Sequence, residues 1–225
     1  MKMKKQTILT ACAVLGLATI ATAAMRTDNF NNGTPAPLWR KQVDVIKVRE
    51  NGRLQFRSNV TQAGEHGTLY ESRGWKFDYT RNYTINLQYR LRPGQVTGNR
   101  QAAVGMIVEP SGGEVDEIVV IVQRDAGGLA VVVEISDEDD PIFERRVPIS
   151  TSQGMLQVRY RASADRLDVL IDGAVVTRVF NVLIGLNTGN GRAELYIGAG
   201  RRGNQFWGWN DVWLDKFQIT GRIFD

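Results

Sequence analysis

One segment, 155–180, constrains the fold more than any other part of the sequence. Apolar side chains alternate with polar ones twice in it, around Val158 and again around Val169. A repeat of two residues is typical of a strand with one buried face. The polar stretch 162–165 and the pair Asp172-Gly173 are turn signals that would reverse the chain. The segment therefore predicts a three-stranded antiparallel meander with one apolar face.

The rest of the chain repeats this organisation. The clearest single strand is 83–91, where apolar and polar residues alternate throughout. Near-continuous β-branched runs at 118–123 and 129–135 predict central strands, and no segment has a helical apolar period. Short strands separated by turns predict an all-β sandwich or barrel in one domain. Further strands are expected at 43–48, 53–57, 68–72, 102–108, 142–149, 194–197 and 212–219, and the acidic stretch 134–140 is expected to be a loop.

The first 23 residues have the composition of a signal peptide. Three lysines lie within residues 1–5, an apolar run follows at 8–20, and Ala21-Thr22-Ala23 is a small-x-small cleavage pattern. We therefore expect a secreted, periplasmic or extracellular protein, cleaved after Ala23 or Ala24, with one domain at 24–225. An alternative is a lipoprotein, because Leu9–Cys12 resembles a lipidation box. Most of the apolar run follows Cys12, however, and this argues against lipidation of that residue.

The charge and the cysteine count exclude several classes of function. The formal charge is +4, but three of the lysines are in the leader, which leaves +1 for the mature domain. No basic stripe is interleaved with aromatic residues, so nucleic acid is not expected as a partner. Cys12 is the only cysteine, so the mature domain has no disulfide and no thiol chemistry. We expect no transmembrane segment after the leader.

Several stretches, in this order, resemble the concanavalin A-like lectin/glucanase jelly rolls, the group that holds laminin-G-like domains and laminarinase-type glycosidases. They are 28–30 with Trp39, 51–54, 167–173, 195–199 and 213–219. The resemblance covers nearly the whole mature chain. It implies an antiparallel jelly-roll sandwich of two curved sheets with a face that often meets glycan. Because this fold carries enzymes, lectins and inert modules, it does not by itself fix the function.

A catalytic site is suggested weakly by the residues 113–118. Laminarinase-type enzymes resemble one another in a Glu-x-Asp-x-Glu strand, and retaining hydrolysis needs two carboxyls about 5–5.5 Å apart. Glu114 and Asp116 match the first two positions, but the third is Ile118, and Glu117 is out of phase unless a bulge re-aims it. The alternative, which we favour, is that a solvated loop leads here into a buried strand.

A ligand-binding site is suggested by the residues 200–213. Aromatic rings can stack on the apolar face of a sugar, while neighbouring amides and guanidinium groups bind its hydroxyls. The alternative is that the tryptophans pack between the sheets or cover a sheet edge. The candidate ligand-binding residues are Arg201, Arg202, Asn204, Gln205, Trp207 and Trp209, with Trp213 in the same strand phase.

The resemblance also implies one structural Ca²⁺ near the chain ends. The matching positions are Asp28, the carbonyl of Gly52 and Asp215, and oxygen ligands of this kind suit calcium. In the alternative, Asp28 caps a turn and Asp215 marks a β-bulge.

The sequence thus predicts an exported module that is not catalytic and binds a polysaccharide, a surface glycan or another surface partner. Two alternatives stay open. One is a laminarinase-type glycoside hydrolase with a displaced carboxylate site, and the other is a purely structural envelope protein.

Overall fold

The computed structural model describes residues 23–31, 39–41, 46–50, 52–58, 69–72, 75–91, 102–110, 116–125, 127–137, 140–184, 186, 188–199 and 211–224. Most of these residues lie in antiparallel strands, and their one helical element is a 3-10 turn at Ala162–Ala164. The predicted all-β fold is confirmed. No helix in the described ranges is long and apolar enough to cross a membrane.

Two sheets form the molecule. Sheet A has the strand order β14-β13-β12-β7-β16-β4-β3, and β1 also pairs with β16. Its strands are β1 (Ala24–Asp28), β3 (Ile46–Glu50), β4 (Leu54–Ser58), β7 (Tyr83–Leu91), β12 (Gln153–Arg161), β13 (Arg166–Ile171), β14 (Ala174–Phe180) and β16 (Asp211–Gly221).

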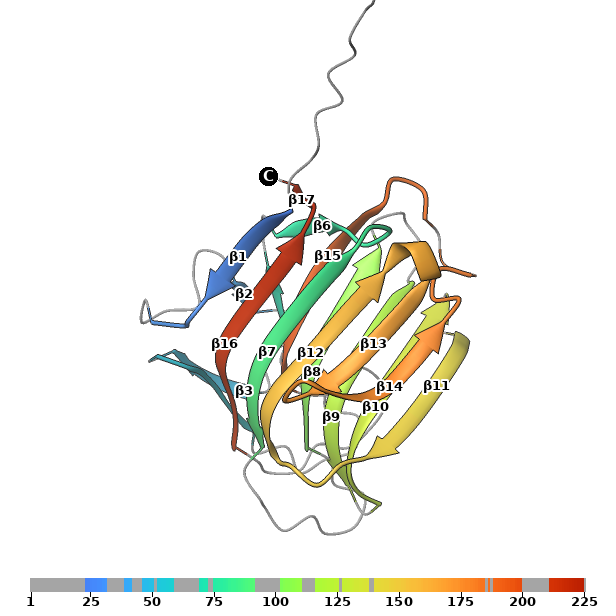
Figure 1. Ribbon diagram of the computed structural model, residues 1–225. Coiled ribbons are helices and arrows are strands. Elements are labelled where there is room, and N and C mark those ends of the chain that lie inside the picture. The colour runs from blue at the N-terminus through green and yellow to red at the C-terminus, as the bar shows by residue number, and fades with distance from the viewer. Residues whose placement is uncertain are drawn as a thin grey trace, which may run out of the picture.

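Sheet B has the order β11-β10-β9-β8-β15-β5-β2, and β6 and β17 extend it beside β15. Figure 1 views the molecule onto sheet A, with the strands of sheet B behind it. The strands of sheet B are β2 (Trp39–Lys41), β5 (Leu69–Ser72), β6 (Lys76–Asp78), β8 (Ala102–Pro110), β9 (Glu117–Asp125), β10 (Gly128–Asp137), β11 (Asp140–Pro148), β15 (Arg192–Ala199) and β17 (Ile223–Phe224).

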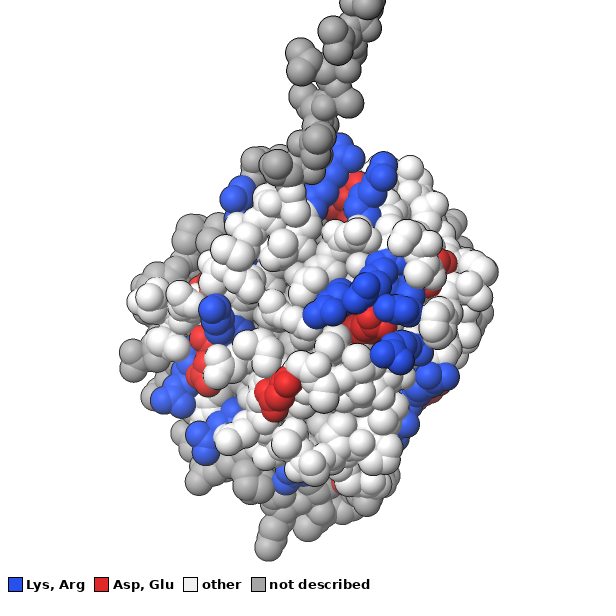
Figure 2. Space-filling model, in the orientation of Figure 1, with Lys and Arg blue, Asp and Glu red and all other residues white. Residues whose placement is uncertain are grey.

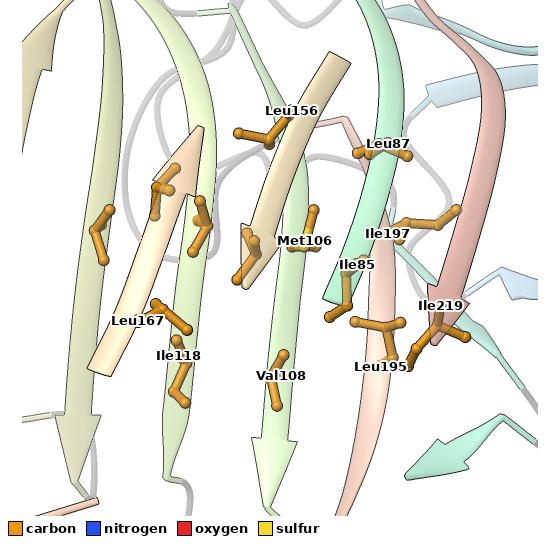
Figure 3. Close-up of a cluster of buried hydrophobic side chains, with 14 of the residues drawn as sticks. Ile85, Leu87, Met106, Val108, Ile118, Leu156, Leu167, Leu195, Ile197 and Ile219 are labelled. Carbon is orange, nitrogen blue, oxygen red and sulfur yellow. The ribbon is translucent and has the colours of Figure 1, made fainter. Parts of the chain in front are cut away.

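The core fills the space between the sheets. Each strand contributes every second side chain, so Ile85 and Leu87 of sheet A face Met106 and Leu195 of sheet B (Figure 3). Aromatic rings close one end, where Tyr83 stacks on Tyr160 at 5.4 Å between centroids. Because apolar burial is the main favourable term in folding, this alternation fixes which face of each strand remains for function.

The predicted meander is present as β12, β13 and β14. Its second turn has left-handed φ angles of 50° at Asp172 and 82° at Gly173, as a tight two-residue hairpin requires. Its first turn is the 3-10 turn closed by Asp165, whose φ is also positive, at 38°. One sequence interpretation needs correction. The predicted acidic loop 134–140 is largely strand, because β10 continues to Asp137 and β11 begins at Asp140.

The open edge between β14 and β11 is bridged by Arg145. Its Nη1 atom donates to Thr177 Oγ1 at 3.2 Å and to the carbonyl of Arg178 at 3.1 Å. Arg145 belongs to sheet B and both acceptors belong to sheet A, so this contact ties the two sheet edges together.

Candidate functional site

The outer face of sheet A, which points away from the core, is predominantly polar in its central strands. On β7 the buried residues alternate with Thr84, Asn86, Gln88 and Arg90. The antiparallel register then sets each of these beside a residue of β16 and a residue of β12. The result is a set of polar rows that cross several strands.

Side-chain amides form one of these rows, which we call the amide ladder (Gln218, Asn86 and Gln157). Asn86 Nδ2 donates to Gln218 Oε1 at 3.0 Å, and Gln157 Nε2 donates to Asn86 Oδ1 at 2.7 Å. The ladder crosses β16, β7 and β12. It continues to Arg159, whose Nη2 donates to Gln157 Oε1 at 2.8 Å. These hydrogen bonds hold three flexible side chains in fixed orientations across the sheet.

Beside the ladder lies an arginine cluster, which we define as Arg159, Arg161, Arg166 and Arg178. Three of its guanidinium groups surround the carboxylate of Asp168, with Nε–O distances of 2.9 Å for Arg166, 3.3 Å for Arg161 and 3.5 Å for Arg178. Figure 2 shows these basic side chains as a group around an acidic one, over β12, β13 and β14. The sequence showed no basic stripe because the residues come from three strands and meet only through the register.

A pocket of about 350 Å³ opens next to the cluster. Arg159 and Arg161 line it together with Asn82, Thr84 and Thr220, and Ala23, which precedes the proposed cleavage point, lies at its wall. Guanidinium, amide and hydroxyl groups therefore face one concave volume at the end of β7 and β12. Such a mixture of donors suits an oxygen-rich ligand.

Aromatic side chains lie at two ends of this face. Trp213 is half-buried, and the guanidinium carbon of Arg90 lies 5.3 Å from the centre of its ring. Phe180 is 58% exposed and pairs with Arg166 across β13 and β14. The hypothesis that Trp213 packs between the sheets is wrong, because the core-facing residue of that stretch is its neighbour Leu214.

The six residues predicted to bind ligand (Arg201, Arg202, Asn204, Gln205, Trp207 and Trp209) lie outside the described residues, as does Glu114. Asp116 and Glu117 are described, and both are buried. Asp116 lies close enough to Tyr79 to affect its titration. Burial raises the pKa of Tyr79 to about 12, and the carboxylates of Asp116 and Asp78 add to this rise.

Alternate residues of β9 face opposite sides of sheet B, and this alternation determines which side Glu117 faces. Ile118, Val120 and Val122 belong to the core between the sheets, whereas Val119 and Ile121 belong to a second cluster on the outer face of sheet B. Glu117 shares the phase of this second cluster. Glu117 therefore lies on the opposite face of β9 from Ile118, the residue at the third position of the Glu-x-Asp-x-Glu pattern.

Other carboxylates do lie near Glu117, on neighbouring strands. Glu109 of β8 pairs with Glu194 of β15. On its other side, the antiparallel register that pairs Val108 with Ile118 brings Glu109 next to Glu117 of β9. Glu194 in turn forms an ion pair with Lys76. We call Glu117, Glu109 and Glu194 the carboxylate row. Opposed residues on adjacent strands have Cβ atoms about 4.5–5.5 Å apart, so the register places these glutamates on neighbouring strands of one face.

The three positions predicted for calcium surround one stretch of β16. Asp28 pairs with Phe217, Asp215 sits at a register shift, and Gly52 lies two residues before Leu54, which pairs with Leu214. Asp28 Oδ1 also accepts a 2.7 Å hydrogen bond from the amide of Phe30. The turn cap and the bulge are thus both present. In the described ranges no group of three His, Cys, Asp or Glu residues could hold a metal, but two carboxylates and a carbonyl are oxygen donors that fit Ca²⁺.

No protein-family model and no curated protein matches the sequence. Many solved structures share the fold. Peanut lectin is 13% identical with a TM-score of 0.60, over 90% of this chain and 99% of its own. A non-specific endo-β-1,3(4)-glucanase from family GH16 is 14% identical with a TM-score of 0.63, over 89% and 91%. The carbohydrate recognition domain of Emp47p is 13% identical with a TM-score of 0.56, over 91% and 99%. The predicted concanavalin A-like lectin/glucanase fold is therefore confirmed.

Proposed function

Starting from the concanavalin A-like fold, we propose that the chain is an exported carbohydrate-binding module without catalytic activity. Its polysaccharide lies across the outer face of sheet A. The amide ladder is the observation that carries this proposal, because its hydrogen bonds hold Asn86, Gln157 and Gln218 in place across three strands. Fixed amides recognise sugar hydroxyls with little loss of side-chain entropy on binding. The aromatic rings of Trp213 and Phe180 offer surfaces for the apolar faces of sugar rings.

The absence of catalysis is supported by the chemistry of the same face. Among the outward side chains of β7, β12, β13 and β14, all described, the one carboxylate is Asp168. It is surrounded by three arginines. Glycoside hydrolysis uses a pair of carboxyl groups, and the outward side chains of these four strands do not include such a pair.

Export is supported by the leader composition and by the position of β1, which begins at Ala24, next to the proposed cleavage point. A structural Ca²⁺ held by Asp28, Gly52 and Asp215 would pin β1 and the β3–β4 hairpin to β16. Such an ion would stabilise the fold and would not take part in binding chemistry.

The experiment is a polysaccharide panel tested by affinity electrophoresis, with and without Ca²⁺. We expect the wild type to be retarded by at least one polysaccharide and Trp213→Ala to lose most of the retardation. Ile142→Ala is the control, since Ile142 is an exposed apolar residue away from this face, on β11 of sheet B. A Trp207→Ala/Trp209→Ala double variant tests the loop site predicted from the sequence. Retardation by no polysaccharide would contradict the proposal and favour a structural envelope protein.

The carboxylate row supports a second candidate function, a glycoside hydrolase that acts on the outer face of sheet B. Its sign would be new reducing ends released from a β-glucan by the wild type. Loss of that release in Glu109→Gln and Glu117→Gln, with retention in Trp213→Ala, would establish this second function.

A further inference from the structure

We infer that the polysaccharide bound by this module is anionic, and that the arginine cluster and its adjoining pocket hold the acid group. This inference rests on the proposed function, because it names the chemical class of the glycan for the same face. The outward-facing side chains of β7, β12, β13 and β14 include five arginines, which are Arg90 and the four of the arginine cluster. They include one carboxylate, Asp168. The local charge is therefore +4, while the mature domain as a whole carries only +1. Positive charge is concentrated on this face.

Asp168, the single carboxylate, is buried beneath the arginine side chains of the cluster. The side chain of Asp168 is only 4% exposed, whereas those of Arg161 and Arg178 are 48% and 54% exposed. Both arginines approach Asp168 most closely through Nε, so their terminal Nη donors lie at the tips of half-exposed side chains. A ligand that reaches this face meets positive charge first. The forked donors of arginine match carboxylate and sulfate groups closely.

The pocket beside the cluster provides partners for the rest of a sugar. Thr84, Thr220 and Asn82 line it opposite Arg159 and Arg161, and their hydroxyl and amide groups can bind sugar hydroxyls. Its volume of about 350 Å³ lies in the range of small-molecule sites. A single acidic sugar residue fits both its size and its donors.

An aromatic surface completes the arrangement on the other side of the cluster. Phe180 is 58% exposed although it is a large apolar residue at the end of β14. It stands in register with Arg166. A ring beside guanidinium groups binds the apolar face of a sugar whose acid group pairs with the arginines.

The uncharged amide ladder distinguishes a glycan from other polyanions. Nucleic acid carries a charge on every nucleotide, so its recognition surface needs positive charge along its whole length. Here the charge is gathered at the cluster, and the row beside it consists of neutral amides. A chain that is rich in hydroxyls and carries acid groups at intervals matches both parts of the surface.

The experiment compares charged polysaccharides with uncharged counterparts of the same backbone, in EDTA. The probes are polygalacturonate with its methyl ester, and dextran sulfate with dextran. We expect the purified wild-type protein to bind at least one charged member about tenfold more tightly than its neutral counterpart. Preference for polygalacturonate identifies a carboxylated glycan and preference for dextran sulfate a sulfated one, and either supports the inference.

The variant Arg161→Gln/Arg178→Gln should lose about tenfold in affinity for the preferred charged probe. The charge-matched control is Arg192→Gln/Arg222→Gln, which removes the same charge beside Phe224 and should bind as the wild type does. Equal binding of charged and neutral probes would overturn the inference and leave the proposed function standing. The inference would be overturned if the protein bound none of the four probes, or if it bound double-stranded DNA as tightly as the preferred probe. The proposed function would also fail if no polysaccharide of the wider neutral panel bound.

Discussion

Replacement of Asp168 by asparagine should make the protein less stable and yet a better ligand-binding protein. Asp168 neutralises part of the arginine cluster, so the cluster charge rises from +3 to +4 when the carboxylate is lost. Stability should fall because a nearly buried carboxylate, paired with three guanidinium groups, becomes a neutral amide. Affinity for an anionic polysaccharide should rise because Asp168 and the ligand compete for the same arginines.

The size of the stability loss follows from the contacts. Arg166 makes the strongest one, with a hydrogen bond from Nη2 to Oδ2 at 3.0 Å and an Nε–Oδ1 distance of 2.9 Å. A hydrogen bond to a charged group contributes about 1.5–3 kcal/mol. The two longer pairs involve half-exposed arginines, and such pairs contribute only about 0.2–1 kcal/mol each. Because asparagine keeps one acceptor, we expect a loss of about 2 kcal/mol, or roughly 4–8 °C in Tm.

The assay is urea unfolding followed by circular dichroism, together with affinity for the preferred charged polysaccharide. Asp172→Asn is the matched control. It removes the same charge from the hairpin four residues later, and asparagine tolerates the left-handed conformation found there. Asp172 Oδ1 accepts a 2.8 Å hydrogen bond from the amide of Met155, which the asparagine oxygen can keep, so the control should change the free energy of unfolding by about 1 kcal/mol or less. A fall in affinity alongside the fall in stability would refute the reasoning, since it would mean that Asp168 holds the arginines ready for the ligand.

Three further predictions concern the close approach of β8 and β9, the ladder and the calcium ligands. Gly105→Ala should destabilise the protein by about 1–3 kcal/mol or more in urea unfolding, because a Cβ there would meet backbone atoms of β9 at 2.2 Å and 2.7 Å; an unchanged midpoint would show that the strands are not so close. Asn86→Ala removes two ladder hydrogen bonds and should cost about 1–2 kcal/mol as well as most of the polysaccharide affinity, and normal affinity would exclude the ladder from binding. Asp215→Asn should abolish any rise in Tm that Ca²⁺ gives the wild type, whereas an equal rise in both proteins would place calcium elsewhere.

Stability should also fall in alkali. Burial raises the pKa of Tyr79 to about 12, and it raises the pKa values of Tyr83, Tyr89 and Tyr160 as well. Since the folded values lie above the unfolded value of about 10, this contribution to stability is complete below about pH 10 and is lost as the pH rises. The free energy of unfolding measured up to about pH 11.5 should decline as tyrosinate absorbance grows. A flat profile would contradict the burial of these hydroxyls.

The sequence predicted those parts of the fold in which the pattern is local. The meander at 155–180 could be predicted because its alternation and its Asp172-Gly173 turn lie within one short segment. β9 shows the limit, since it is apolar on both faces and its sequence does not reveal which face meets the core. From the sequence around Glu114 and Asp116 it was therefore not possible to predict that Ile118 faces the core between the sheets.

The candidate surface was harder to predict because it depends on contacts between distant strands. Residues 218, 86 and 157 meet only when β16, β7 and β12 lie side by side, and strand order cannot be read from alternation. The arginines of β12, β13 and β14 were visible as polar positions of the meander. The convergence of Arg161, Arg166 and Arg178 on Asp168 follows from the register, which pairs Arg161 with Arg166 and Asp168 with Arg178.

The central claim, that sheet A carries the binding face, is tested most directly by comparing variants of the two faces in one binding assay. The pair is Trp213→Ala on sheet A and Glu109→Gln on sheet B, with affinity for the preferred polysaccharide and release of reducing ends measured on both. The account predicts that Trp213→Ala loses about tenfold or more in affinity, that Glu109→Gln binds as the wild type does, and that none of the proteins releases reducing ends. Loss of binding in Glu109→Gln with retention in Trp213→Ala would contradict the claim and place the polysaccharide on sheet B.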